Sequence, residues 1–502
     1  MRAVQLRLGD LEERLRTRLQ GMADDDVVAR IWARDHTVWK DDPTEIADRL
    51  GWLEAGERSR RGLADIRGFA GEARGNGFRH AVLLGMGGSS LAPEVVTAAR
   101  RSAGLTVLDT THPDAVTRLE REIPLRDTMF LVSSKSGTTI ETRSHMALFL
   151  DLVKDPTHFV AITDPKTPLE EAATELGFRR TFAAPPDVGG RYSALTVFGL
   201  VPAALAGVDP EEVLDPAREA AASCGPDVAI ENNPGAVLGA ALGEAALAGR
   251  DKATMSFGES LAPLGAWLEQ LLAESTGKEG RGVLPVDGEP LASPEVYGAD
   301  RLFVTTPGVE VPGPSVELPL RGPADLGWAF FVLEFATALA GSILGINPFD
   351  QPDVQSAKDR TAEVLGAGHV PDEAPGDVGA LLETVRPGDY VAIQAFIDPG
   401  GATARDLPEM RARLRDRLGV ATTLGFGPRY LHSTGQYHKG GPNTGVFLQL
   451  FEEPEEDRAV PGKELTFGRL IAAQAAGDLA ALREGGRRAG RVSVDDLLSW
   501  NG

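Results

Sequence analysis

Short apolar runs alternate with longer mixed segments in the first half of the chain, and each run is followed by a turn. The candidate strands there are 81–84, 106–109, 129–132 and 159–163. Apolar runs of this length, bounded by turn residues, are typical of buried strands, and their alternation with helical segments indicates a parallel sheet. We therefore predict an α/β domain over 71–208.

The segments before and after this domain have different patterns. A helical lead-in is predicted over 1–70, with Trp32, Trp39 and Trp52 as its apolar anchors. The polar, proline-containing stretch 209–234 is typical of a domain boundary.

A second α/β domain is predicted over 235–450. Its candidate strands are 255–257, 283–285, 302–306 and 390–394. The stretch 366–386, which is rich in Gly, Pro and acidic residues, is interpreted as an exposed connection, and 451–502 as a helical tail. The predicted fold class is therefore α/β, with helical N- and C-terminal extensions.

One apolar run is long enough to cross a membrane. It extends from Leu326 to Ile346 and contains a single charge, Glu334. A carboxylate near the middle of a lipid-spanning helix is costly, and small residues interrupt the run. We therefore interpret this run as a buried helix and expect no membrane partner.

Composition favours a soluble cytoplasmic enzyme. The 502 residues carry a net charge of −22, which argues against a nucleic-acid partner. Cys224 is the single cysteine, so an intramolecular disulfide and a multi-cysteine metal site are excluded. The N-terminal segment becomes charged within a few residues and has no secretory signal pattern.

The turn after the candidate strand 129–132 has the composition of a phosphate-binding loop. Its hydroxyl donors are Ser133, Ser134, Ser136, Thr138 and Thr139, and a helix is predicted to begin near Ile140. Backbone N–H groups at a strand-to-helix turn have no intrahelical partner and bind anions well, and Gly137 permits close approach of a ligand. The alternative is an ordinary hydroxyl-capped start of a helix.

A second turn, Gly85-Met-Gly-Gly-Ser-Ser90, has the same construction after strand 81–84. It lacks the third glycine of the dinucleotide-binding fingerprint. Two such turns, each after a strand, suggest one crevice at the carboxyl ends of a parallel sheet.

Two further segments carry candidate catalytic groups. Gln270 and Glu274 are spaced to share one face of a helix, and Glu274 lies where that helix ends. Glu274 is either a general base or a solvated residue at a helix end. Arg191 follows two glycines, so its planar cation is either placed close to a ligand or paired with a surface carboxylate.

Five motifs in chain order resemble those of the glucose-6-phosphate isomerase family. They are Gly85-Met-Gly-Gly-Ser-Ser-Leu-Ala-Pro93, Ser134-Lys-Ser-Gly-Thr-Thr-Ile-Glu-Thr142, Val188-Gly-Gly-Arg-Tyr-Ser193, Gln270-Leu-Leu-Ala-Glu-Ser-Thr-Gly-Lys278 and Gly345-Ile-Asn-Pro-Phe-Asp-Gln-Pro-Asp-Val-Gln-Ser-Ala-Lys358. The chain resembles in particular the isomerase part of bifunctional transaldolase/glucose-6-phosphate isomerases. It is too short to carry a transaldolase barrel as well.

The resemblance implies two sugar-isomerase (SIS) domains, each a doubly wound α/β sandwich. It implies a reversible aldose–ketose conversion of glucose 6-phosphate and fructose 6-phosphate through a cis-enediolate, a step of glycolysis and gluconeogenesis. The substrate is a small sugar phosphate, and no cofactor or metal is expected. We also expect a homodimer.

The resemblance also implies roles for individual residues. By motif position the substrate-binding residues are Gly88, Ser89, Ser134, Lys135, Ser136, Thr138, Thr139 and Gln270. Arg191 would stabilise the enediolate, and Glu274 would move a proton between C2 and C1. Lys358 would assist ring opening or bind the substrate.

The chain departs from the family pattern in two places. Gly288-Glu-Pro290 is present, but the ring-opening histidine that commonly follows it in the family is not. Asp353 replaces a small residue in the last motif. The Gly-rich segment 429–445 contains two histidines, and we expect His438, or failing that His432, to provide the missing acid/base group.

Two other functions fit the same motifs. One is an SIS isomerase of another sugar phosphate, such as mannose 6-phosphate. The other is a non-catalytic regulator that binds a sugar phosphate, although such a protein gains nothing from keeping Arg191, Glu274 and Lys358 together.

Overall fold

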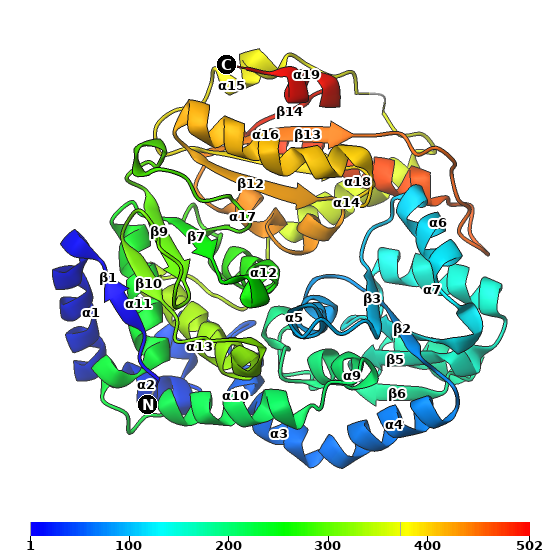
Figure 1. Ribbon diagram of the computed structural model, residues 1–502, viewed down its shortest axis with the longest axis horizontal. Coiled ribbons are helices and arrows are strands. Elements are labelled where there is room, and N and C mark those ends of the chain that lie inside the picture. Colours follow the sequence, from blue (N-terminus) through cyan, green and yellow to red (C-terminus); the bar gives the residue numbers. More distant parts are fainter. Residues whose placement is uncertain (1, 372, 502) are drawn as a thin grey trace.

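The computed structural model describes residues 2–371 and 373–501, which form three β-sheets with helices around them (Figure 1). The first sheet has the strand order β3-β2-β4-β5-β6 and is parallel throughout. Its strands are β2 (His80–Gly85), β3 (Leu105–Leu108), β4 (Thr128–Ser133), β5 (Phe159–Thr163) and β6 (Arg180–Ala183). The four strands predicted from the sequence are confirmed, and β6 is added to them.

Helices cover both faces of this sheet because its strands are apolar on both sides. Ala81 and Leu83 belong to one buried core, whereas Val82 and Leu84 belong to another. The surrounding helices are α4 (Leu63–Gly75), α5 (Leu91–Ala99), α6 (Pro113–Glu122), α7 (Ile140–Val153), α8 (Pro168–Leu176) and α9 (Val197–Leu205). The predicted doubly wound arrangement is therefore observed here.

The second sheet has the order β1-β10-β9-β7-β8, in which only β1 runs antiparallel to its neighbour. Its strands are β1 (Gln5–Arg7), β7 (Lys252–Ser256), β8 (Leu284–Val286), β9 (Arg301–Thr305) and β10 (Ser315–Glu317). Its helices are α10 (Glu211–Ser223), α11 (Pro234–Leu247), α12 (Leu264–Thr276) and α13 (Leu326–Leu344), whereas α14 (Val354–Gly366) packs against α18 (Phe467–Glu484).

The predicted helical lead-in joins this second sheet. It contains α1 (Glu12–Asp24), α2 (Val27–Trp32) and α3 (Ala55–Arg61), but its first residues form the edge strand β1. Trp39 and Trp52 are buried, and Trp32 packs against the same core. The stretch 209–234 is not an open linker, because it contains α10, whose buried Val213 and Leu214 lie on the side packed against α13.

The long apolar run forms α13. In the part of the chain that the structure describes, one helix, Pro323–Leu344, is long and apolar enough to cross a membrane, and 89% of its most apolar window is buried within the protein. The interpretation of this run as a buried core helix is confirmed. Burial raises the pKa of Glu334 in its middle well above the ordinary value.

The third sheet was not predicted. It has the parallel order β12-β11-β13-β14, formed by β11 (Tyr390–Phe396), β12 (Ala421–Phe426), β13 (Gly445–Phe451) and β14 (Arg488–Arg491). Its helices are α15 (Val378–Leu382), α16 (Ala402–Leu418), α17 (Gly435–Gly440), α18 (Phe467–Glu484) and α19 (Val494–Ser499). Only β11 was expected from the sequence.

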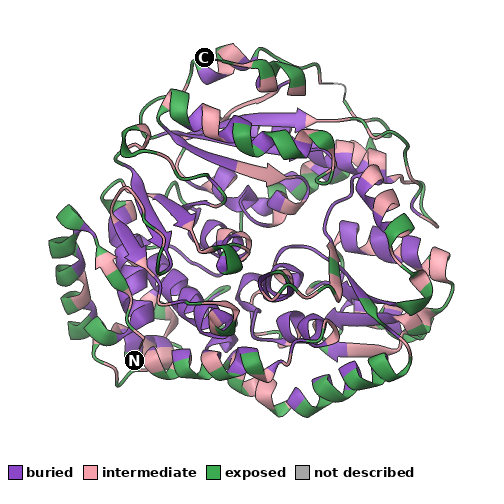
Figure 2. Ribbon diagram, in the orientation of Figure 1, coloured by how far each residue is buried: buried purple, intermediate pink, exposed green. Residues whose placement is uncertain are grey.

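The expected helical tail 451–502 therefore needs a correction. Its described part contains α18 and α19, but also β14, which pairs with β13 and completes the sheet. The sequence of β14 is Arg-Ala-Gly-Arg, and a short charged strand of this kind at a sheet edge has no apolar pattern to mark it. Figure 2 shows that the strands of the sheets are mostly buried, whereas the outer faces of the surrounding helices are exposed.

Candidate active site

The loop between β4 and α7 has an internal hydrogen-bond network. Ser134 Oγ lies 2.9 Å from Thr139 Oγ1 and accepts the Gly137 N–H at 3.1 Å. Ser136 Oγ lies 2.9 Å from Thr138 Oγ1. Gly137 has φ +69°, a conformation that favours glycine, and a Cβ there would lie 2.8 Å from Leu169 N. The loop is thus held in one shape before any ligand binds.

The glycine-rich turn after β2 lies directly against the segment that carries Arg191. A Cβ on Gly88 would lie only 2.1 Å from the carbonyl oxygen of Gly190. Ser193 Oγ donates to Gly88 O at 3.3 Å, and Ser89 is buried. Glycine at position 88 is therefore required for the close backbone approach that places Ser89 near Arg191.

Arg191 and Glu274 form a buried ion pair. Arg191 Nη1 donates to Glu274 Oε2 at 3.0 Å, and both side chains are almost completely buried. Arg191 Nη1 also donates to Gln351 Oε1, and Nη2 donates to Pro348 O and Asp350 O. Arg191 Nε is buried and has no hydrogen-bond partner among the described residues. One N–H group of the guanidinium is therefore left unpaired by the described residues.

Gln270 connects this ion pair to the third sheet. Its Nε2 atom lies 3.4 Å from Glu274 Oε2 and donates to His432 O at 2.8 Å. Gln270 and Glu274 share one face of α12, as the sequence spacing predicts. The helix end thus faces both Arg191 and the 429–440 segment of the third sheet.

A cavity of about 280 Å³ lies beside this group. Among the predicted residues, Ser136, Thr138, Thr139 and Lys358 line it. His432 and Lys439 also line the cavity, so its wall combines hydroxyl donors with cationic or protonatable groups. This combination suits a phosphorylated, hydroxyl-rich ligand.

Other predicted binding residues lie behind the cavity wall. Lys135 Nζ pairs with Asp164 Oδ2 at 2.5 Å and does not line the cavity. Ser134 holds the loop from within through Thr139 and Gly137. Gln270, Arg191 and Glu274 do not line the cavity, and Gln270 donates to the carbonyl of His432, which does.

His432 lies between the Gln270–Glu274 face of α12 and the cavity. Its carbonyl accepts from Gln270, and its Nε2 atom lies 2.9 Å from Glu141 Oε1. Burial alone raises the pKa of Glu141, but the charge and hydrogen bond of His432 outweigh it, so this pKa lies below its ordinary value. Gln474 Nε2 donates to the same carboxylate oxygen at 2.7 Å.

The sequence reasoning missed Glu141 and Gln474. Glu141 lies within the recognised loop motif but was not given a role, and its position in the first turn of α7 was the available signal. Gln474 lies on α18, in a part of the chain that no motif marks.

The two candidate histidines, His438 and His432, lie in different surroundings. His438 is buried among Tyr390, Tyr430 and Phe447, and its Nδ1 atom lies 3.0 Å from Tyr390 OH. It does not line the cavity, and burial lowers its pKa well below the ordinary value. The aromatic neighbours come from separate strands and loops, so local sequence did not reveal this packing.

The third sheet contacts both places where the chain departs from the family pattern. Buried Glu289 pairs with Arg301 and accepts hydrogen bonds from the backbone and side chain of Thr422 on β12. Gln436 Nε2 donates to Asp353 Oδ2 at 2.6 Å, and Asp353 N donates back to Gln436 Oε1. Glu289, which precedes the first departure, and Asp353, which is the second, thus both contact the third sheet and its helices.

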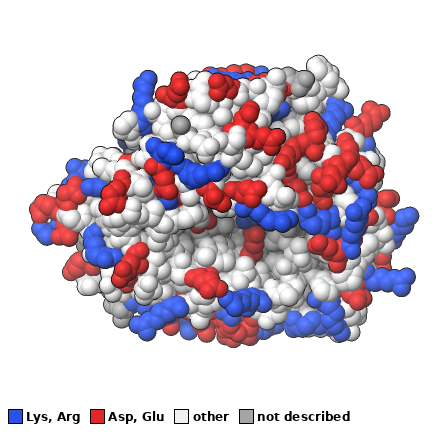
Figure 3. Space-filling view, turned by 45° about the horizontal axis from the view of Figure 1, so that its top comes forward, with Lys and Arg blue, Asp and Glu red and all other residues white. Residues whose placement is uncertain are grey.

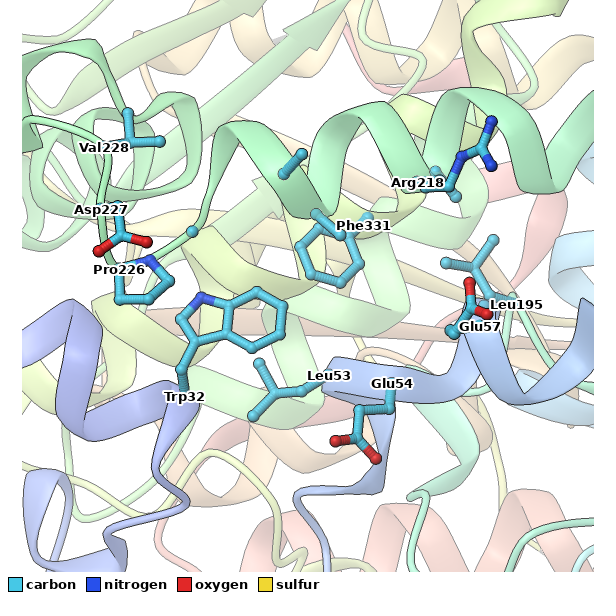
Figure 4. A pocket seen from close by; sticks show the side chains of 15 residues that line it. Trp32, Leu53, Glu54, Glu57, Leu195, Arg218, Pro226, Asp227, Val228 and Phe331 are labelled. Carbon is cyan, nitrogen blue, oxygen red and sulfur yellow. The ribbon is translucent and has the colours of Figure 1, made fainter.

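A larger cavity of about 520 Å³ lies between α2, α3, α10 and α13 (Figure 4). Its walls include Trp32, Leu53, Leu195 and Phe331, and its charged groups stand apart from one another. Neither the hydroxyl loop nor the Arg191–Glu274 pair reaches it. Its lining does not offer the convergent polar groups of a catalytic site.

Charge is not concentrated in one patch on the face seen in Figure 3, where acidic and basic side chains are mixed. Since the net charge is −22, an anionic ligand depends on local donors at the site.

The fold and the site define an α/β protein with a hydroxyl-rich loop and a buried Arg–Glu pair at the carboxyl ends of parallel strands. A family model described as phosphoglucose isomerase matches residues 63–284. A glucose-6-phosphate isomerase of Carboxydothermus hydrogenoformans is 31% identical over 385 residues, covering 61% of this chain and 82% of the relative. One from Thermus thermophilus is 30% identical over 404 residues, covering 64% and 91%. The chain belongs to the phosphoglucose isomerase family.

A solved structure supports the fold. The crystal structure of a glucose-6-phosphate isomerase from Chlamydia trachomatis matches with a TM-score of 0.59 at 18% identity, over 70% of this chain and 85% of that one. The expected family and α/β fold class are confirmed. The domain boundaries and the roles of the individual residues stay predictions.

Proposed function

We propose that this protein interconverts glucose 6-phosphate and fructose 6-phosphate. The observation that carries the proposal is the direct contact of Arg191 with Glu274, next to a cavity walled by the hydroxyl loop and Lys358. An aldose–ketose isomerase needs a base for the proton alpha to the carbonyl and a positive group for the enediolate oxygens. Membership of the phosphoglucose isomerase family supports this substrate class.

The phosphate of the substrate binds at the loop between β4 and α7. Ser136, Thr138 and Thr139 line the cavity, and the first N–H groups of α7 point out of the helix start. Ser134 supports this end from within the loop, and Ser89 supports it from the turn after β2.

His432 and Lys358 open the sugar ring. Both line the cavity, and an opening step requires a proton to leave the C1 hydroxyl while another reaches the ring oxygen. A histidine paired with a carboxylate transfers protons readily near neutral pH. His432 therefore takes the role first expected of His438.

Glu274 then removes the C2 proton of the open-chain aldose and returns it to C1, while a proton moves between O1 and O2. The electron pair of the C2–H bond forms the C1–C2 double bond of the cis-enediolate. Arg191 offers its free Nε–H and its charge to the developing oxyanion. No cofactor takes part in these steps.

A coupled assay with fructose, glucose and mannose 6-phosphates tests the proposal. We expect conversion between the glucose and fructose esters to exceed that of the mannose ester. Equal turnover of mannose 6-phosphate would favour a broader isomerase, and binding without turnover of any of the three would favour a non-catalytic regulator.

The setting of the enzyme is proposed as well. We propose a cytoplasmic homodimer that acts on a small sugar phosphate and has no nucleic-acid or membrane partner. Sedimentation analysis of the purified chain tests the dimer.

A further inference from the structure

Lys278 and Arg191 hold the same turn of the chain. This turn, residues 347–350, lies between α13 and α14. Lys278 Nζ donates to Asn347 O at 2.7 Å and to Asp350 O at 2.5 Å. Arg191 Nη2 donates to Pro348 O at 3.1 Å and to the same Asp350 O at 2.6 Å. The two cations thus share one carbonyl oxygen.

The carboxylate of Asp350 completes this arrangement. Its Oδ1 atom accepts from Lys278 Nζ at 2.6 Å, and no hydrogen bond joins this carboxylate to Arg191 among the described residues. On the side of this turn, the guanidinium therefore donates only to backbone carbonyl oxygens and to the amide oxygen of Gln351. It keeps its ion pair with Glu274. The Asp350 carboxylate is thus paired with Lys278, whereas Arg191 bonds the backbone carbonyl of the same residue.

We propose that Lys278 is a positioning residue for Arg191: its ammonium fixes the 347–350 turn and occupies Asp350, so that the guanidinium stays directed at Glu274 and the reacting oxygens. This inference rests on the proposed function, because it assigns a purpose to the placement of Arg191.

Burial of Lys278 is consistent with a specific role. Its side chain is 3% exposed. Burial and the nearby Arg191 lower the pKa of Lys278 to about 7, while Asp350 and Glu274 act in the opposite direction. An ammonium in this environment is costly, and the turn that it holds is the direct partner of Arg191.

Replacing Lys278 by Met removes the ammonium while keeping most of the volume. The Asp350 carboxylate then loses its partner, and Arg191 is the nearest cation to replace it. We expect kcat to fall by about tenfold to a hundredfold, since a small displacement of a catalytic group has effects of this size. We expect KM to change by less than about threefold, because the hydrogen bonds of the Lys278 side chain in the described residues go to Asn347 and Asp350 and not to the phosphate loop.

Lys252→Met is the matched control. Lys252 is equally buried and donates to a backbone carbonyl, Gly388 O, and to Asp251 Oδ1, both at 2.7 Å. It lies at the start of β7, and among the described residues its polar partners are Asp251, Gly388 and Asp300. We expect this variant to lose stability but to keep kcat within about twofold.

Two ligands separate positioning from general damage. Arabinonate 5-phosphate carries a carboxylate that mimics the enediolate, whereas sorbitol 6-phosphate carries only hydroxyl groups at that end. We expect Lys278→Met to raise the dissociation constant of the first ligand at least about tenfold, as measured by calorimetry. The dissociation constant of the second ligand should rise by less than about twofold.

The outcomes are distinct. The inference is overturned if Lys278→Met binds both ligands equally more weakly, or if its kcat is unchanged. In either case the activity of the wild-type protein still supports the proposed function. A wild-type protein that binds neither ligand and converts no sugar phosphate overturns the proposed function, and the inference falls with it.

Discussion

His432 and Glu141 are separated by 291 positions in the chain, yet His432 Nε2 lies 2.9 Å from Glu141 Oε1. One residue follows β12 of the third sheet, and the other lies in the first turn of α7 beside the first sheet. This contact closes the cavity between the hydroxyl loop and the 429–440 segment.

The first prediction concerns His432→Gln. This change keeps a hydrogen bond to Glu141 within reach but removes the group that accepts and returns a proton. We expect turnover of the cyclic substrate to fall by about a hundredfold, a usual size for acid–base catalysis. The coupled assay measures it, with exposed His80→Gln as the control. A loss of less than about threefold would assign ring opening to other groups, such as Lys358 and water.

The second prediction concerns Glu274→Gln. Glutamine keeps the volume and the contact with Arg191 but is not a base. We expect isomerisation to fall by at least about a hundredfold, while the fold and the binding of sorbitol 6-phosphate are retained. Turnover is measured by the coupled assay and binding by calorimetry. Exposed Glu279→Gln is the matched control, and a Glu274 variant within a few-fold of wild type refutes the role of the base.

The third prediction concerns the phosphate end of the cavity. In the double variant Ser136→Ala/Thr139→Ala, the dianion loses two hydroxyl donors that together contribute on the order of 2–6 kcal/mol. We expect KM for the sugar phosphate to rise at least tenfold, as measured by initial rates, with a smaller change in kcat. Ser499→Ala, at the end of α19, is the control. An unchanged KM means that the phosphate binds elsewhere.

The fourth prediction concerns stability and pH. Burial, together with the nearby Asp287, raises the pKa of Glu269 on α12 to about 7. Because this pKa is higher in the folded state, the group's stabilising contribution is complete below about pH 4.5 and is lost as the pH rises through 7. Glu269→Gln stays neutral, so we expect it to exceed wild type in unfolding free energy at pH 8 by at most about 3 kcal/mol.

Urea denaturation at pH 5 and pH 8 checks this prediction, and the two proteins should be close in stability at pH 5. Glu259→Gln, whose side chain is 88% exposed, should show no such pH dependence. A Glu269→Gln effect of the same size at both pH values contradicts the assigned cause.

Short sequence patterns predicted correctly those elements that depend on residues close together in the chain. The apolar runs of β2 and β4 are buried on both faces, and the turns after them contain the residues that strand-to-helix connections need. The spacing of Gln270 and Glu274 placed both on one helical face, as observed. Each of these conclusions depends on fewer than about fifteen consecutive residues.

The rest depended on contacts between distant segments. The strand β13, Gly445-Val-Phe-Leu-Gln-Leu-Phe451, is apolar enough to be recognised, but its glycine-rich approach was interpreted as a loop. The choice between His432 and His438 depends on which side of the 429–440 segment faces Tyr390 and which faces Glu141. No spacing rule contains that information, because α17 is short and packs between sheets.

The third sheet also sets the order in which this enzyme becomes complete during synthesis. The two strand-to-helix turns and Arg191 leave the ribosome early, whereas Gln474, which binds the Glu141 carboxylate, is made hundreds of residues later. Domains fold in the order of their synthesis. The first sheet is therefore folded long before His432, Lys439 and Gln474, which line the opposite side of the cavity, are made. We therefore expect a chain that ends before α18 to fold its first sheet but to lack isomerase activity, because the Gln474 contact with Glu141 is missing.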